Sequence, residues 1–163
     1  MELAEYQLKA QKTALPTALN VDYLVPMIIG EIGEMLGQQG KAVRDEWTAG
    51  RLQKELISEY GDICWGTAVL LRHLGVFGGE GYIFSVGTDP MTALLTAGAG
   101  LHIARQDSAE QWLDDAAENM WFTLKHHCET VTGVSFETVL ETNVAKLADR
   151  AERGVLQGRG DAR

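Results

Sequence analysis

Two pairs of acidic residues stand in otherwise apolar sequence: Glu31 with Glu34, and Glu59 with Asp62. Each pair has the spacing i, i+3, which places both carboxylates on one face of a helix. Because their neighbours are apolar, we expect these acids on the side of each helix that faces the core. Four carboxylates close together repel one another unless a cation lies among them. The pattern predicts a site for Mg²⁺, with Mn²⁺ as an alternative, because hard divalent cations prefer oxygen ligands. Two unrelated exposed acidic pairs are the alternative interpretation.

Other metal chemistries fit the sequence less well. A di-iron carboxylate bundle needs Glu-x-x-His on two helices, and none of the four histidines has a glutamate three residues earlier. The run His126–Cys128 is a poor ligand cluster, because consecutive side chains on a helix point in different directions. The two cysteines, Cys64 and Cys128, have no CxxC spacing. This argues against a structural disulfide or a cysteine-based zinc site and favours a reducing, cytoplasmic location.

The apolar residues mostly recur at spacings of three and four, which predicts an all-α fold, a bundle of about five to six helices. Capping residues, prolines and glycines set the expected bounds. Pro26 fits the second helix if it falls in the first turn. The residues 82–86 are expected in a loop, because no partner strand is evident. The expected helices cover residues 2–13, 20 or 22–39 (closed by Gly40), 49–73, 90–105, 108–131 (capped by Asp107 or Ser108) and 136–153.

The length and charge limit the partners. A chain of 163 residues suggests one domain, which we place at residues 1–153, followed by a basic, glycine-rich tail at 154–163. The 14 basic and 23 acidic residues give a net charge of −9, so we expect neither a nucleic-acid polymer nor an anionic membrane as partner. We also find neither a membrane-spanning apolar run nor the features of a signal peptide.

The order of the motifs resembles the all-α NTP pyrophosphatases of the MazG-like superfamily, many of them from phages and bacteria. Glu31-x-x-Glu34, 24 intervening residues and Glu59-x-x-Asp62 are similar to the signature of that family. The C-terminal block at 142–163 also looks like that of its members. The resemblance covers about residues 3–75 and 134–163.

The resemblance implies Mg²⁺-dependent hydrolysis of (d)NTPs to the monophosphate and pyrophosphate. Glu31, Glu34, Glu59 and Asp62 would hold the metal and serve catalysis. A bound metal neutralises the triphosphate and lowers the pKa of the water that attacks the α-phosphorus. One glutamate would orient or deprotonate this water, and Glu31 is our preference.

Phosphate charge also calls for cationic partners. Asn143, Lys146 and Arg150 have the spacing i, i+3, i+7 and share one face of the last helix. With the resemblance, we favour substrate contacts for this set over side chains that only extend along the surface. Trp47 and Trp65 are candidate stacking partners for a nucleobase, although packing is the more common role of tryptophan. The candidate substrate-binding residues are Lys41, Lys54, Asn143, Lys146 and Arg150.

The segment 76–133 departs from the family, because in its short members the last helix follows almost directly after the second acidic helix. Residues 95–101 faintly echo 29–35, and 115–121 echo 59–65 with an acidic pair retained at Asp115 and Glu118. One hypothesis is that 90–131 is a degenerate second copy that packs as a pseudo-dimer. The alternative is coincidence. Members of the family usually form dimers or tetramers, so we expect a homodimer or a higher homo-oligomer unless the second copy replaces an interface.

Two functions compete with a pyrophosphohydrolase. One is a non-catalytic nucleotide-binding or metal-binding helical protein of the same fold. The other is a helical interaction module whose acidic pairs are surface features. The sequence selects neither a base nor a sugar, nor does it say whether diphosphates are substrates.

Overall fold

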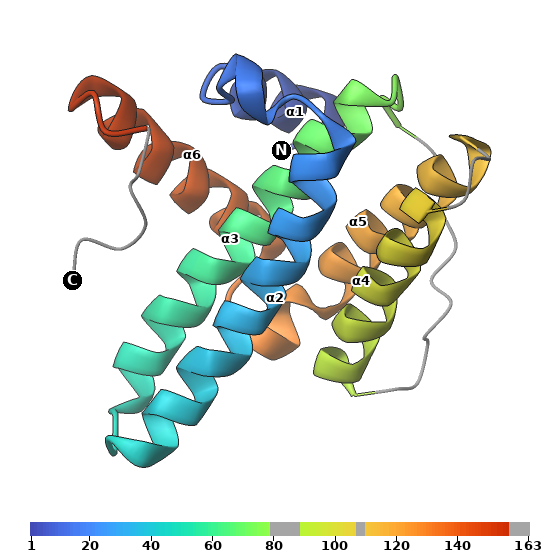
Figure 1. The fold of residues 1–163 in the computed structure, drawn as a ribbon. Helices are drawn as coiled ribbons and strands as arrows, with labels where there is room; N and C mark the ends of the chain where they lie inside the picture. The colour runs from blue at the N-terminus through green and yellow to red at the C-terminus, as the bar shows by residue number, and fades with distance from the viewer. Residues whose placement is uncertain (79–88, 107–109, 157–163) are drawn as a thin grey trace.

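The computed structural model describes residues 1–78, 89–106 and 110–156. All regular elements in these residues are helical (Figure 1). This confirms the expected all-α bundle. The helices are α1 (Leu3–Gln11), the short 3-10 helix η1 (Pro16–Ala18), α2 (Val21–Arg44), α3 (Ala49–His73), α4 (Pro90–Gln106), α5 (Glu110–Thr132) and α6 (Phe136–Glu152).

Four of the helices form an up-and-down bundle made of two antiparallel hairpins, α2 with α3 and α4 with α5 (Figure 1). The hairpins pack against each other, α4 on α2 and α5 on α3. Helices α1 and α6 both contact α3, and α6 leaves the bundle on the side away from α4 (Figure 1). One flank of the first hairpin is therefore covered by the second hairpin, and the other flank borders α6.

The core explains the orientation of α2. Its side chains Leu24, Ile28, Ile32 and Met35 are at most 1% exposed, and their spacing of three and four places them on one stripe. Gly66 of α3 allows α2 to come close, because a Cβ there would lie 2.9 Å from Ile28 Cγ1. The apolar stripe fixes which face of α2 is left for polar side chains.

The helix starts agree well with the sequence-based expectations. Side chains cap three helices as N-cap acceptors: Asn20 from the Tyr23 amide, Thr48 from the Arg51 amide and Ser135 from the Thr138 amide. Asp89 accepts from the amides of residues 91 and 92 just before α4. Residues 107 and 108, the expected caps of α5, lie outside the described residues, as do 82–86 and most of the tail.

Two expectations about α2 are wrong. The helix continues through Gly40 to Arg44, because a glycine inside a helix costs only about 1 kcal/mol and Ala42 buries its side chain beyond it. The chain reverses instead around Glu46, which has a positive φ of 51°. Pro26 lies inside the helix, beyond the first turn. It therefore removes one backbone hydrogen bond, to the carbonyl of Asp22.

The segment that separates the two matched regions holds α4 and α5, and they pack on the first hairpin in the manner proposed for a second copy. Their origin by duplication stays a hypothesis. In the described part of the chain, every helix is too short or too polar to cross a membrane.

Candidate metal and substrate site

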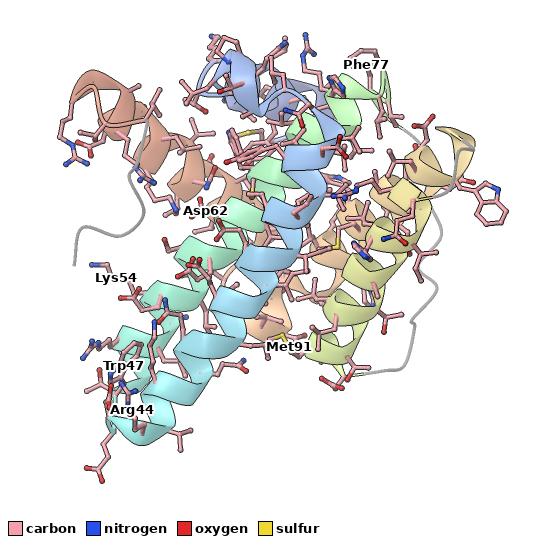
Figure 2. All side chains as sticks on the ribbon, viewed as in Figure 1. Arg44, Trp47, Lys54, Asp62, Phe77 and Met91 are labelled. Carbon is pink, nitrogen blue, oxygen red and sulfur yellow. The ribbon has the colours of Figure 1, made fainter. Side chains whose placement is uncertain are left out.

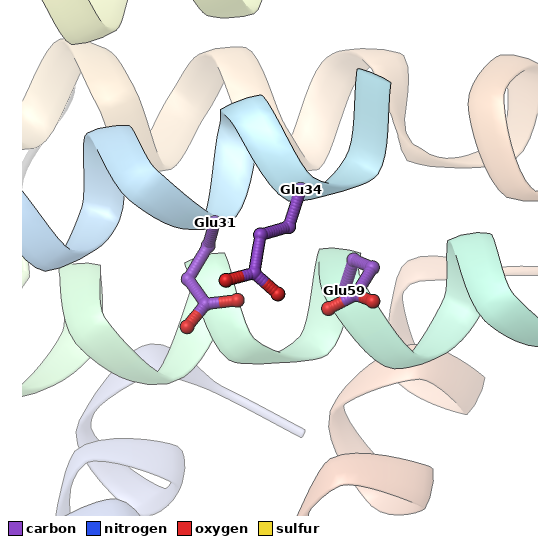
Figure 3. Close-up of side chains that lie close together, drawn as sticks. All are labelled: Glu31, Glu34 and Glu59. Atoms are coloured by element: carbon purple, nitrogen blue, oxygen red, sulfur yellow. The ribbon is translucent and has the colours of Figure 1, made fainter. Parts of the chain in front are cut away.

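The structure brings three of the four predicted acids together. Glu31 and Glu34 of α2 and Glu59 of α3 each offer a carboxylate oxygen, and these oxygens lie within 4.8 Å of one another (Figure 3). The i, i+3 spacing on α2 and the antiparallel crossing of α3 place them there. Glu34 is exposed, while Glu31 and Glu59 are half-buried. The expectation that the acids face the core is wrong, because an apolar interior strongly disfavours ionised carboxylates.

Burial and nearby negative charge raise the pKa of two of these glutamates, Glu31 and Glu59. Burial, together with the charges of the neighbouring carboxylates, raises the pKa of Glu31 to about 8 against the opposing effect of Lys146. Burial also raises the pKa of Glu59. Glu31 therefore retains a proton near neutral pH when no cation is bound. Three close carboxylates are a donor set that suits Mg²⁺ or Mn²⁺, and a bound divalent cation would relieve their repulsion.

Gln38 belongs to the same cluster. Its Nε2 donates to Glu59 Oε1 at 2.7 Å, which lowers the pKa of Glu59 against the effect of burial. The predicted substrate residue Lys41 is exposed, and its Nζ donates to Gln38 Oε1 at 3.3 Å. The sequence analysis missed Gln38, although its position four residues after Glu34 places it on the same face of α2.

Asp62 lies apart from the three glutamates and is held by α6. Its Oδ1 accepts from Asn143 Nδ2 at 2.9 Å, and its Oδ2 accepts from Lys146 Nζ at 2.6 Å. Lys146 also donates to Ser58 Oγ at 3.1 Å. Asp62 is near enough to raise the pKa of Glu31. Its role as a metal ligand stays a prediction.

A cavity of about 400 Å³ lies between α3 and α6, next to this ion pair. Its wall carries three of the predicted substrate residues, Lys54, Asn143 and Lys146, and Figure 2 shows Lys54 and Asp62 along α3. Arg150, half-buried on α6, is not among the described residues that line the cavity. The complete lining is Gly50, Gln53, Lys54, Ile57, Ser58, Thr142, Asn143 and Lys146.

The two tryptophans considered as stacking partners, Trp47 and Trp65, have different surroundings. Trp65 donates from Nε1 to the Ala10 carbonyl at 3.2 Å and to Thr13 Oγ1 at 3.1 Å, so it ties α1 to α3 and confirms a packing role. Trp47 lies at the tip of the first hairpin (Figure 2). The guanidinium carbon of Arg51 stands 3.9 Å from the centroid of its ring. One face of Trp47 is therefore already covered by a cation.

The site thus joins a half-buried carboxylate cluster to a cavity with cationic and amide groups on its wall. Such a pairing can bind a divalent cation together with a polyanion. The chain matches none of the family models, curated proteins or solved structures with which it was compared.

Proposed function

We propose that the protein is a Mg²⁺-dependent nucleoside triphosphate pyrophosphohydrolase that converts (d)NTPs to (d)NMPs and pyrophosphate. One observation carries the proposal: the carboxylate oxygens of Glu31, Glu34 and Glu59 lie within 4.8 Å of one another. The nearby cavity with Lys54 and Lys146 on its wall supports it, and so does the resemblance to MazG-like pyrophosphatases. A cytoplasmic location, a homo-oligomeric assembly and a role in the nucleotide pool of a cell or phage belong to the same proposal.

Glu31, Glu34 and Glu59 would hold the cation, with Asp62 as the neighbouring carboxylate. When bound, Mg²⁺ or Mn²⁺ supplies positive charge against the phosphates and lowers the pKa of a coordinated water. Lys146 and Lys54 contribute charge from the cavity side, and an ammonium beside a phosphate oxygen forms a strong, charge-assisted hydrogen bond.

Glu31 is our choice for the residue that accepts a proton from the attacking water. A general base works best when its pKa lies near the working pH. Burial and the neighbouring carboxylates raise the pKa of Glu31 to about 8 in the metal-free protein, well above that of an ordinary glutamate, and a bound cation would lower this value. Glu34, which is exposed, lacks this degree of burial.

One observation favours a second candidate, a protein that binds a metal or nucleotide without turnover. Asp62 is already paired with Lys146 at 2.6 Å, so a carboxylate that the catalytic proposal places beside the metal is neutralised by a residue of the chain itself. In this alternative the three glutamates bind a cation and no bond is cleaved.

The deciding experiment is a pyrophosphate-release assay on the full chain with a panel of NTPs and dNTPs, in Mg²⁺ and in Mn²⁺. We expect release from at least one nucleotide and none in excess chelator. Absence of release across the whole panel would overturn the enzymatic proposal. Calorimetric titration with Mn²⁺ and a non-hydrolysable nucleotide would then show whether the protein only binds.

A further inference from the structure

Four polar side chains from three different helices form a hydrogen-bonded row that runs from the interior to the candidate site. Tyr6 of α1 donates from its hydroxyl to Asn143 Oδ1 at 2.9 Å. Asn143 of α6 donates from Nδ2 to Asp62 Oδ1 at 2.9 Å. The second oxygen of Asp62 accepts from Lys146 at 2.6 Å, and Lys146 lines the cavity.

The donors and acceptors of this row can be arranged in only one way. An ionised carboxylate only accepts hydrogen bonds, so the amide nitrogen of Asn143 must face Asp62. The amide oxygen of Asn143 then faces Tyr6, and the Tyr6 hydroxyl must be the donor. Removal of that hydroxyl leaves the Asn143 oxygen without its donor.

The row is also held in place by close packing. The side chain of Tyr6 is fully buried and Asn143 is 3% exposed. A Cβ at Gly61 would lie only 2.9 Å from Asn143 Cβ, so the absence of a side chain at 61 is what admits Asn143. Buried polar groups that lose a partner pay the full cost of desolvation, which leaves the row little freedom to rearrange.

We infer that Tyr6 is a positioning residue of the candidate site: through Asn143 it fixes the Asp62 carboxylate, and through Asp62 it holds the Lys146 ammonium at the cavity wall. Tyr6 itself is neither a lining residue of the cavity nor a member of the glutamate cluster. The inference rests on the proposed function for its kinetic readout. It makes α1 part of the substrate-binding machinery and not only a cover over α3.

The first test is Tyr6→Phe, which removes the hydroxyl and keeps the ring that packs 5.9 Å from Trp121. We expect KM for the nucleotide to rise about fivefold, in line with the loss of one hydrogen bond, with a much smaller change in kcat.

Tyr60→Phe is the matched control. Tyr60 is also fully buried, and its hydroxyl donates to the Leu124 carbonyl at 2.7 Å, away from the row. Both variants should lower the thermal midpoint to a similar extent, but only Tyr6→Phe should raise KM. An unchanged KM in Tyr6→Phe, or an equal rise in Tyr60→Phe, would overturn the inference.

A second measurement does not depend on activity. In ¹⁵N NMR spectra of the full chain, the Asn143 side-chain amide should exchange with water more slowly in the wild type and in Tyr60→Phe than in Tyr6→Phe. Identical exchange in all three would refute the positioning role even if pyrophosphate is released. If the wild type releases no pyrophosphate, the proposed function fails while the exchange experiment still decides on the row.

Should Tyr6→Phe fold poorly, Asn143→Asp tests the same row from its centre. The new carboxylate can still accept from Tyr6, but when ionised it cannot donate to Asp62 and repels it. We expect a larger rise in KM than for Tyr6→Phe. A KM equal to that of the wild type would overturn the inference.

Discussion

The two hairpins of the bundle have the same architecture and very different polar chemistry. When residues 95–101 are aligned with 29–35, Ala97 and Gly100 stand where the first hairpin has Glu31 and Glu34. Ala97 is buried against the rest of the bundle. In the described part of the chain, only the first hairpin gathers three carboxylates within reach of one cation. The hairpin architecture alone therefore does not create a candidate metal site. The acids on α2 distinguish the first hairpin from the second.

The two hairpins also differ in their contact with α6. Asp115 and Glu118 keep an acidic pair on α5 at the places of Glu59 and Asp62, but α6 packs mainly on α3. Asp62 therefore receives Lys146 as a counter-ion. The comparison teaches that carboxylate spacing becomes a candidate site only where two helices supply acids and a third supplies cations.

One contact joins the two hairpins at equivalent positions. In the same alignment Gly98 corresponds to Ile32, and a Cβ on Gly98 would lie 3.0 Å from Ile32 Cδ1. Equivalent positions meet in this way near a twofold axis. The contact supports the duplication hypothesis.

The largest effect should come from Glu59→Gln. It keeps the shape of the side chain and removes a charge from the cluster, so we expect pyrophosphate release to fall about a hundredfold or more, with weaker Mn²⁺ binding in calorimetry. The matched variant in the second hairpin is Asp115→Asn, at an exposed position. It should stay within about twofold of the wild type. Full activity of Glu59→Gln would remove this residue from the site.

Lys146→Met should have the next largest effect. It removes the cation that pairs with Asp62 and lines the cavity. A hydrogen bond to a charged group contributes about 1.5–3 kcal/mol, so KM for the nucleotide should rise roughly ten- to a hundredfold. Lys125→Met, at an exposed position on α5, is the control and should leave KM unchanged. If both variants behave alike, Lys146 has no special role in binding.

The free energy of unfolding should depend on pH through a residue of the first hairpin, Glu31, and not through the acidic pair of the second hairpin. Glu31 has a pKa of about 8 in the folded chain against an ordinary 4.5, so between these values the folded state binds more protons than the unfolded state. The free energy of unfolding of the metal-free protein should therefore fall as pH rises from about 4.5 to 8. Urea titrations in chelator at several pH values measure this.

Glu31→Gln should flatten that dependence and stabilise the metal-free protein above pH 8. Glu118→Gln, at the equivalent of Asp62 in the second hairpin, should leave the slope in place. A slope that survives in Glu31→Gln would place the responsible group elsewhere.

The smallest effect concerns helix packing. Gly37 of α2 is exposed, and a Cβ there would meet nothing within 4 Å. Gly37→Ala should stabilise the protein by about 0.5–1 kcal/mol, the usual gain of alanine over glycine within a helix. Gly98→Ala should gain less, because the new Cβ presses on Ile32. Thermal unfolding of both variants measures the difference, and equal gains would mean that the hairpins are not tightly apposed at this point.

Local signals in the sequence predicted most of the fold. Caps such as Thr48 and Ser135 act within a few residues, so the starts of α3 and α6 could be predicted. The end of α2 could not, because the glycine signal at 40 was outweighed by burial of Ala42. Spacing likewise predicted the convergence of the glutamates on two adjacent helices.

The rest of the site depends on long-range packing. Lys146 and Asp62 are 84 residues apart, and Tyr6 and Asn143 are 137 apart. Periodicity showed that Asn143 and Lys146 share a face of α6, but nothing in the spacing shows which helix that face meets. The small residue at 61 was the one local sign of a close approach.

The site has an acidic half on α2 and α3 and a cationic half that includes Lys146 of α6. The contacts that hold these halves together close loops of different length. The contact between Gln38 and Glu59 spans 21 residues, whereas that between Lys146 and Asp62 spans 84. The longer loop carries an additional entropic cost of about 1.2 kcal/mol, since each doubling adds about 0.6 kcal/mol. The acidic half is therefore encoded in one contiguous hairpin. A chain whose α6 has come away would keep its cation ligands and Lys54 while losing Lys146 and the α6 wall of the cavity.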